Sequence, residues 1–259
     1  MESICKEVIK LSIKAGLYQK KENESFDQSR IESKGANDFV SYVDKESEKQ
    51  LIEGLSKILP EAGFMSEENY TEIPPTDYFW VIDPLDGTSN YVHKLFPYSV
   101  SIALMHQKEV ILGCVHEVSL GETFYAWKGG KAWLNEQPIR VSQTPRIHNS
   151  MIAYGIPYIP EPAYEYVRDG IRSLYGKCTL RHMGSAAAEL CYVAAGRTDA
   201  YFHDHLSPWD VAAGSIILTE AGGKITDFSS EENFIFGKEV VATNGLLHEE
   251  LLSVVGKKQ

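Results

Sequence analysis

The residues best suited to chemistry stand at positions 80–90, which read Trp-Val-Ile-Asp-Pro-Leu-Asp-Gly-Thr-Ser-Asn. The apolar run at 79–82 has the composition of a buried strand. Pro84 cannot continue a central ladder, so we expect the strand to end before it. Asp83 and Asp86 would then converge on one point beyond the strand end. Carboxylate oxygens are the ligands that Mg²⁺ prefers, so the pair predicts a metal site.

The turn that follows could hold a phosphate group, because Gly87 and Thr88 offer backbone N–H groups and a hydroxyl. A metal site next to a phosphate cradle indicates phosphoryl chemistry. A plainer interpretation stays open, since Asp-Gly and Gly-Thr-Ser clusters are common in turns and Asp83 or Asp86 could cap a helix. An EF-hand is excluded: its acidic ligands alternate, these stand three apart, and the twelfth position is Lys94.

Three segments, in the same order along the chain, resemble motifs of the inositol monophosphatase family. The members of that family are magnesium-dependent, lithium-sensitive phosphomonoesterases. One family motif, W-x-x-D-P-[IL]-D-G-T-[ST]-N, is matched at 80–90. A second, W-D-x-A-A-G followed by E-A-G-G, stands at 209–214 and 220–223. A third, G-E-E, appears at 66–68 with Ser in place of Gly. The resemblance extends over about 34–243, nearly the whole chain.

The resemblance implies two or three Mg²⁺ ions. By resemblance their ligands are the side chains of Glu67, Asp83, Asp86 and Asp210 and the carbonyl of Leu85. Asp83 would bridge two ions, and Glu67 would hold the ion that binds the attacking water. Crowded carboxylates raise one another's pKa values, so the empty site should be looser than the loaded one. Glu67 could instead be a solvated loop acid, and Asp210 can also complement a helix dipole.

The resemblance assigns catalysis to Glu67, Thr88 and Asp44. Thr88 would be the partner of the nucleophilic water, and Asp44 would accept a hydrogen bond from its hydroxyl. Asp44 could equally be the N-cap of the helix that follows it, and the two roles are compatible.

Substrate binding is expected at two turns and one side chain. Amides at a helix N-terminus would hold phosphate oxygens. The segment 181–187 resembles the family's R-x-x-G-[ST]-A-A, which touches the substrate alcohol, although Ser185 could be a helix cap alone. The expected substrate-binding residues are Gly87, Thr88, Ser89, Gly184, Ser185, Ala186 and His203.

One departure concerns His203, seven residues before Asp210. Family members that favour inositol phosphates often have Glu there to bind ring hydroxyls, and a His cannot copy an acceptor-only carboxylate in all its states. The preferred substrate therefore stays open among inositol phosphates, sugar phosphates such as fructose 1,6-bisphosphate, and the 2′-phosphate of NADP. His203 and His205 could also be surface residues without a role, or bind zinc.

The implied function is Mg²⁺-dependent hydrolysis of small phosphate monoesters by a metal-activated water, as in an inositol-phosphate phosphatase. Alternatives within this chemistry are an NADP 2′-phosphatase, a fructose-1,6-bisphosphatase or a dual-specificity sugar and nucleotide phosphatase. Ser89 counts against the 3′-nucleotidase relatives, which usually carry Lys there. From other classes, a non-catalytic metal-binding regulatory protein and an RNA- or polymerase-associated role remain alternatives.

Composition bounds the partners and the location. The chain has 259 residues, is 43% hydrophobic and carries a net charge of −11, which argues against nucleic-acid and anionic-membrane partners. No stretch approaches the roughly 20 apolar residues of a membrane span. The four cysteines are far apart, as is typical of reduced cytoplasmic proteins: Cys5, Cys114, Cys178 and Cys191. We expect a cytoplasmic enzyme acting on a small phosphorylated metabolite, and the resemblance implies a homodimer.

Two patterns divide the chain. Residues 1–145 should form an N-terminal α+β half that carries most metal ligands, and residues 146–259 a C-terminal α/β half that carries Asp210 and the substrate-side segment. In the first half we expect helices over 4–18 and 44–59, a loop or short strand over 20–37, and strands at 79–82, 99–105, 109–116 and 122–127 in an antiparallel or mixed sheet. In the second half we expect helices near 162–174, 185–196, 209–221 and 246–255 that alternate with strand-like segments at 152–154, 181–183, 199–202 and 240–243. The resemblance implies a layered α-β-α-β-α sandwich of the inositol monophosphatase and fructose-1,6-bisphosphatase type.

Overall fold

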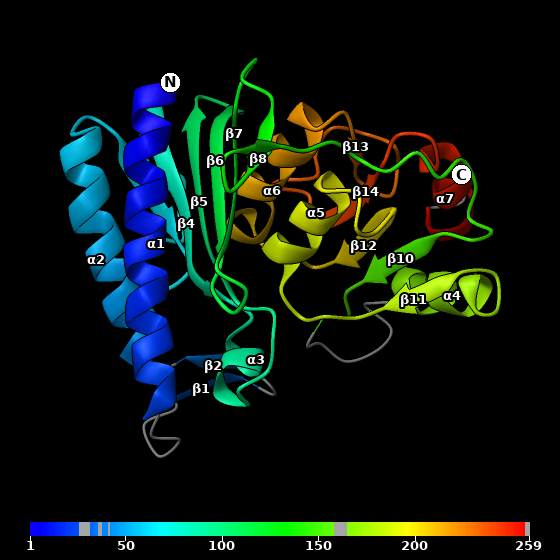
Figure 1. The fold of residues 1–259 in the computed structure, drawn as a ribbon, viewed down its shortest axis with the longest axis horizontal. Helices are drawn as coiled ribbons and strands as arrows, with labels where there is room; N and C mark the ends of the chain where they lie inside the picture. Colours follow the sequence, from blue (N-terminus) through cyan, green and yellow to red (C-terminus); the bar gives the residue numbers. More distant parts are fainter. Residues whose placement is uncertain (26–31, 36–37, 41, 158–164, 257–259) are drawn as a thin grey trace.

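The computed structural model describes residues 1–25, 32–35, 38–40, 42–157 and 165–256, with side chains described outside 26–41. Helices and sheets alternate in layers across the molecule (Figure 1). Two helices cover the outer face of a seven-stranded sheet, two lie between it and a five-stranded sheet, and two cover the far face of the second sheet. The expected α-β-α-β-α sandwich is confirmed.

The outer helical layer consists of α1 (Glu2–Glu24) and α2 (Tyr42–Ile58), which pack against each other and against the first sheet. Their buried apolar side chains join one core with that sheet. The helix α1 is longer than predicted, because residues 20–24 continue it. Lys and Glu are good helix formers, and the side-chain amide of Gln19 anchors this end by donating to the Pro84 carbonyl over 2.6 Å.

The first sheet is mixed, within the range predicted: β3 runs parallel to β4, and all other neighbours are antiparallel. Its short outer strands were not predicted, because runs of two to four residues carry little periodicity. The strands are, in spatial order, β3 (Gly63–Ser66), β4 (Tyr78–Asp86), β5 (Ser99–His106), β6 (Glu109–Glu117), β7 (Glu122–Trp127), β8 (Ala132–Leu134) and β9 (Gln137–Pro138).

The second sheet contains the strands of the alternating half. Its spatial order is β11 (Thr179–Arg181), β10 (Met151–Tyr154), β12 (Ala200–Asp204), β14 (Glu239–Thr243) and β13 (Lys224–Thr226). Strand β10 runs parallel to both neighbours, and β14 antiparallel to both of its own. The helices α4 (Glu165–Leu174) and α7 (His248–Val255) cover the outer face. The predicted start of α4, at 162–164, lies outside the described residues.

The middle layer consists of α5 (Ala186–Ala194) and α6 (Pro208–Glu220), which are buried on nearly all sides because sheets lie on both faces. Small residues let this layer pack closely. At Gly113 of β6, a Cβ atom would lie only 2.5 Å from the Ala213 carbonyl oxygen. The first turns of α5 and α6 thereby reach the end of β4 that carries the predicted site.

Two small elements complete the fold. A two-stranded ladder pairs β1 (Glu32–Gly35) with β2 (Asp38–Val40), and a short helix α3 (Thr88–Val92) follows β4. None of the described helices is both long and apolar enough to cross a membrane. The predicted division at 145/146 lies between β9, the last strand of the first sheet, and β10, the first strand of the second sheet along the chain. That this point is a domain boundary stays a prediction.

Candidate active site

Strand β4 delivers both predicted aspartates to one face of the sheet. The prediction that the strand ends before Pro84 is wrong, because β4 continues to Asp86 through an irregularity in the ladder. Asp83 pairs with Ser101 and Asp86 with Ser99, so three steps on β4 match two on β5. Residues three apart would normally face opposite sides, and the extra residue of the bulge restores a common side. Pro84 is tolerated because a bulged position needs no ladder N–H.

Three aspartates form a compact group at this point. Asp83, Asp86 and Asp210 each offer a carboxylate oxygen, and these oxygens lie within 4.8 Å of one another. Asp210 enters from the first turn of α6, where the backbone N–H of Ser207 donates to it over 2.7 Å. Asp210 therefore belongs both to the first turn of α6, where an acid complements the helix dipole, and to the aspartate group.

Asp86 is fixed by the start of α5. It accepts hydrogen bonds from the Ser185 hydroxyl at 2.5 Å and from the backbone N–H groups of Ala187 at 2.9 Å and Ala186 at 3.2 Å. Ser185 is also the N-cap of α5, accepting the N–H of Ala188 at 3.4 Å. The predicted substrate-side turn is thus joined directly to an aspartate of the cluster.

Burial and mutual repulsion make the carboxylates reluctant to ionise without a cation. Burial raises the pKa of Asp83 well above its usual value, and the charges of Glu67, Asp86 and Asp210 raise it further. Burial likewise raises the pKa of Asp210, followed by repulsion from Asp86. Burial also raises the pKa of Asp86, although hydrogen bonds from Ser185 and its neighbours oppose that rise. A buried set of oxygen donors with this electrostatic character fits hard divalent cations.

Glu67 approaches the group from the turn after β3. It does not belong to the compact set of three, yet its charge raises the pKa of both Asp83 and Asp210. Its backbone N–H donates to the Ile82 carbonyl over 3.3 Å, which ties the turn to β4. The side chain is half-buried, so the interpretation as a solvated loop acid does not describe it.

Thr88 and Asp44 meet as predicted. The Thr88 hydroxyl lies 3.1 Å from a carboxylate oxygen of Asp44 and 3.0 Å from the carbonyl oxygen of Leu85. Asp44 is buried, with 1% of its surface exposed. The N-cap interpretation of Asp44 is wrong, because α2 begins at Tyr42 and Asp44 lies inside its first turn.

The two predicted substrate-binding turns pack against each other. Gly87 has a φ of +89°, and a Cβ there would lie 3.0 Å from the Pro97 carbonyl oxygen and 3.1 Å from that of Gly184. Only a glycine fits this conformation and space comfortably. Asn90 joins the same pieces, because its side-chain amide donates to the carbonyls of Pro97 at 2.8 Å and Met183 at 2.7 Å. Ser89 follows in the first turn of α3.

His203 lies on β12 with its ring over Gly155, where an added Cβ would fall 2.2 Å from Nδ1. Nδ1 is hydrogen-bonded to the buried Tyr201 hydroxyl at 2.7 Å. Burial, aided by His182 and His205, lowers the pKa of His203 to about 3, so the ring is neutral at physiological pH. It is partly buried rather than a plain surface residue.

The structure gives no support to zinc binding by these histidines. The His205 ring pairs with Asp204, Nδ1 lying 2.9 Å from the carboxylate. Across the described part of the chain, the three aspartates form the one group with metal-ligand geometry.

Sequence reasoning missed two buried glutamates beside the site. Glu189 lies one turn into α5 and accepts the Met183 N–H over 3.1 Å, which fixes the substrate-side turn. Glu48 of α2 accepts hydrogen bonds from Ser66 and Asn69, on either side of Glu67. The available signal was the spacing of Glu48, four residues after Asp44 on the same helix face.

Comparison with known proteins gives the family. The sequence profile of the inositol monophosphatase family matches residues 1–259. The chain is 38% identical over 224 residues to the fructose-1,6-bisphosphatase/inositol-1-monophosphatase of Thermotoga maritima, covering 86% of this chain and 84% of that protein. It is 34% identical over 247 residues to the Nus factor SuhB of Escherichia coli, covering 95% of this chain and 92% of that protein.

The fold comparison agrees. The crystal structure of the extragenic suppressor protein SuhB from Bartonella henselae superposes with a TM-score of 0.93 at 32% identity, covering 99% of this chain and 100% of that one. A match over the whole length, together with the aspartate group at the end of β4, places this protein in the inositol monophosphatase family.

Proposed function

We propose that this phosphomonoester hydrolase uses Mg²⁺ held by the carboxylates of Glu67, Asp83, Asp86 and Asp210 and by the carbonyl of Leu85. The observation that carries the proposal is the approach of three aspartate carboxylates to within 4.8 Å of one another in a buried setting. Within the group their neighbours are other acids, and the charges of Glu67, Asp86 and Asp210 raise the pKa of Asp83. Two or three ions would resolve this repulsion.

Bound Mg²⁺ would neutralise the phosphate and lower the pKa of a water molecule, the chemistry that phosphate monoesters require. Thr88 would orient the nucleophilic water. Because its hydroxyl proton is donated to Asp44 or to Leu85 carbonyl, a lone pair on Oγ1 is left to accept a hydrogen bond from that water. Asp44, buried and fixed in the first turn of α2, keeps the hydroxyl in this orientation.

The turn at Gly87, Thr88 and Ser89 would bind the phosphate oxygens through its backbone N–H groups. The turn at Gly184, Ser185 and Ala186 would contact the alcohol part of the substrate. The second assignment is supported by the close packing of Gly184 on Gly87. Phosphate and alcohol would then bind on adjacent walls.

His203 would face the alcohol part of the substrate as a neutral ring. Family members that favour inositol phosphates often have an anionic Glu at this position instead. We therefore propose a substrate range that includes sugar phosphates as well as inositol phosphates. The name of the Thermotoga maritima relative, which combines both activities, supports this range. The alternative substrate is NADP, from which the enzyme would remove the 2′-phosphate.

Lithium sensitivity, a homodimer, a cytoplasmic location and the absence of a nucleic-acid partner are further parts of the proposal. The net charge of −11 supports the last of these, because it repels phosphate backbones. Inhibition by Li⁺ and the mass in solution by light scattering test the first two.

The direct test is phosphate release from inositol 1-phosphate, fructose 1,6-bisphosphate, NADP, adenosine 3′,5′-bisphosphate and glycerol 2-phosphate, with and without Mg²⁺. We expect turnover that requires Mg²⁺. The variant His203→Glu should shift preference towards inositol 1-phosphate. An unchanged preference would place selectivity elsewhere, and no release from any compound would contradict the proposed function.

A further inference from the structure

A buried acid on α2 has no part in the reaction described so far. Glu48 is 1% exposed and lies one helical turn after Asp44, on the same side of α2. Taking a carboxylate out of water is costly unless hydrogen-bond donors compensate it. The groups that donate hydrogen bonds to Glu48 therefore indicate its role.

All three donors come from one turn. The Ser66 hydroxyl and the side-chain amide of Asn69 both donate to the Glu48 carboxylate, and the backbone N–H of Asn69 donates to Oε1 over 3.2 Å. Ser66 immediately precedes Glu67, and Asn69 follows two residues later. Glu48 thus holds the chain on both sides of the proposed metal ligand.

Backbone contacts hold the rest of the turn that carries Glu67. The backbone N–H of Glu67 donates to the carbonyl oxygen of Ile82 at 3.3 Å, and that of Ser66 donates to the carbonyl oxygen of Tyr70 at 2.8 Å. These bonds attach the turn to β4 and close it on itself. Ser66 stands where the family motif has Gly, so this chain adds a side-chain contact at that position.

We propose that Glu48 is a positioning residue: it fixes the turn at Ser66 and Asn69 so that the carboxylate of Glu67 faces Asp83 and Asp210. One face of α2 then organises two parts of the site, since Asp44 fixes Thr88 and Glu48 fixes Glu67. The inference rests on the proposed function, in which Glu67 is a metal ligand.

The consequence concerns metal affinity rather than substrate affinity. Residues that orient a ligand typically change metal affinity by about 10- to 100-fold when removed. Glu48→Ala should raise the Mg²⁺ concentration for half-saturation about tenfold. At saturating Mg²⁺ its KM for substrate should stay at the wild-type value, because the turn that would bind phosphate, around Gly87, is untouched.

The experiment measures Mg²⁺ binding without turnover, by calorimetry and by the rise in Tm with Mg²⁺. It uses wild type, Glu48→Ala, Glu67→Ala and the double variant. If Glu48 acts through Glu67, its removal should have no further effect on Mg²⁺ binding in the Glu67→Ala background, which a double-mutant cycle shows as strong coupling. Glu48→Gln should bind within about threefold of wild type, because an amide oxygen can accept the Asn69 N–H.

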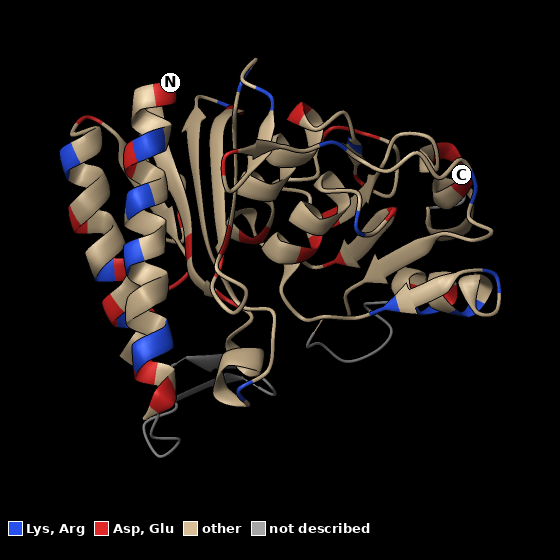
Figure 2. Cartoon of the chain, viewed as in Figure 1, with Lys and Arg blue, Asp and Glu red and all other residues tan. Residues whose placement is uncertain are grey.

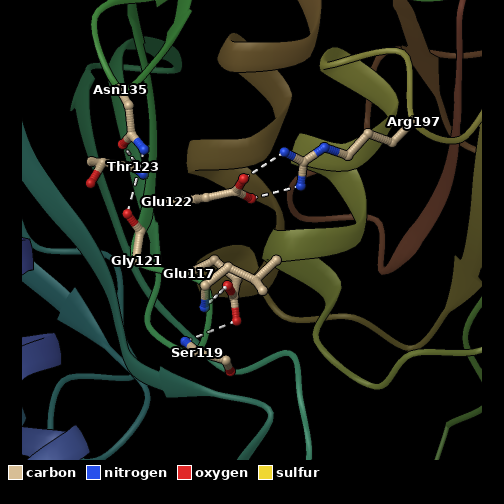
Figure 3. Close-up of polar contacts among 8 residues, drawn as sticks. Glu117, Ser119, Gly121, Glu122, Thr123, Asn135 and Arg197 are labelled. Carbon is tan, nitrogen blue, oxygen red and sulfur yellow. Dashed lines mark hydrogen bonds and ion pairs between the residues drawn. The ribbon is translucent and has the colours of Figure 1, made fainter.

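Glu117 is the matched control. It is also fully buried, and it accepts two backbone N–H groups in its own turn, from Ser119 at 3.1 Å and Leu120 at 2.7 Å (Figure 3). Glu117→Ala should lose stability and keep wild-type Mg²⁺ binding. A merely structural role for Glu48 would make the two variants alike.

Milder variants protect the test against misfolding. Ser66→Gly and Asn69→Ala each remove part of the contact, and each should weaken Mg²⁺ binding by about threefold, less than removal of the whole group. Wild-type Mg²⁺ binding in Glu48→Ala, or full additivity with Glu67→Ala, would overturn the inference. Failure of the wild-type protein to bind Mg²⁺ at all would instead overturn the proposed function on which it rests.

Discussion

Two regions of this molecule bury carboxylates, and they treat them in opposite ways. Beside strands β6 and β7, Glu122 forms two hydrogen bonds with Arg197, both at 2.6 Å, and Glu117 accepts two backbone N–H groups (Figure 3). The Arg197 guanidinium also lies over Tyr192, 5.2 Å from the ring centroid. Each acid there has its partner within the chain.

At the end of β4 the acids face other acids. Asp86 and Asp210 raise the pKa of Asp83, Asp86 raises that of Asp210, and Glu67 adds to the effect on both. Asp and Glu residues are spread over much of the molecule (Figure 2). Burial alone therefore does not mark a functional acid, whereas buried acids that repel one another indicate a site for an external cation.

The largest effect should follow from neutralising one member of the aspartate cluster. Asp83→Asn or Asp210→Asn would remove a proposed metal ligand worth several kcal/mol in the transition state, so kcat/KM should fall by about 100-fold or more. Folding should be kept, because a repulsion is removed, and the metal-free Tm should rise. Circular dichroism and a thermal melt check both points. Full activity in either variant would remove the metal assignment.

Thr88→Ala tests the orientation of the nucleophile. The hydroxyl contacts Asp44 and Leu85, so its loss should lower kcat by about 100-fold, the usual scale for a group that assists proton transfer. The KM should change little, since the backbone N–H of residue 88 is retained. Steady-state kinetics with saturating Mg²⁺ separate the two parameters, and an unchanged kcat would exclude Thr88 from the mechanism.

The pH dependence of stability should differ between the two regions. Folding raises the pKa of Asp83 and Asp210 above the usual 3.8, so above that pH the folded state holds more protons than the unfolded state. The free energy of unfolding of the metal-free protein should therefore fall as pH rises from about 4, relative to Asp83→Asn. Mg²⁺ should abolish that fall.

Denaturant unfolding in EDTA and in Mg²⁺, at pH values from 4 to 8, measures this difference. A wild-type curve that runs parallel to that of Asp83→Asn in EDTA would contradict the repulsion among these acids. Glu122→Gln offers the comparison in the other region, where no such Mg²⁺ effect is expected.

The smallest effect should come from the ion pair itself. Glu122→Gln removes a charge from a pair whose Arg197 side chain is 37% exposed, so water screens much of the attraction. We expect a loss of about 0.2–1 kcal/mol in the free energy of unfolding and no change in kcat/KM. Equilibrium denaturation and a phosphate-release assay check the two values. Lost activity would mean that this region reaches the site.

The residues of the site could be predicted from the sequence better than the strand and helix geometry that positions them. The run at 80–90 and Asp210 pointed to a shared cluster, and Thr88 does meet Asp44. The bulge through Pro84 could not be predicted, since Pro usually ends a strand and only the pairing with β5 shows the extra residue. The start of α2 was misplaced for a similar reason, because Asp44 is a good N-cap by type.

The hydrogen-bond partners of the two buried glutamates could not be predicted from the sequence. Glu48 contacts Ser66, 18 residues away, and Glu189 closes on Met183 only because the turn before α5 folds back. Neither partner is fixed by local spacing. The short strands β3 and β13 carry too few residues for a periodic pattern and form because neighbouring strands supply their hydrogen bonds.

Calorimetric titration with Mg²⁺ tests directly whether the aspartate cluster binds Mg²⁺. We expect that wild type binds at least two ions, that Asp83→Asn weakens binding by about tenfold or more, and that Glu122→Gln binds like wild type. Equal binding by wild type and Asp83→Asn would contradict this expectation, because the ions would then lie elsewhere.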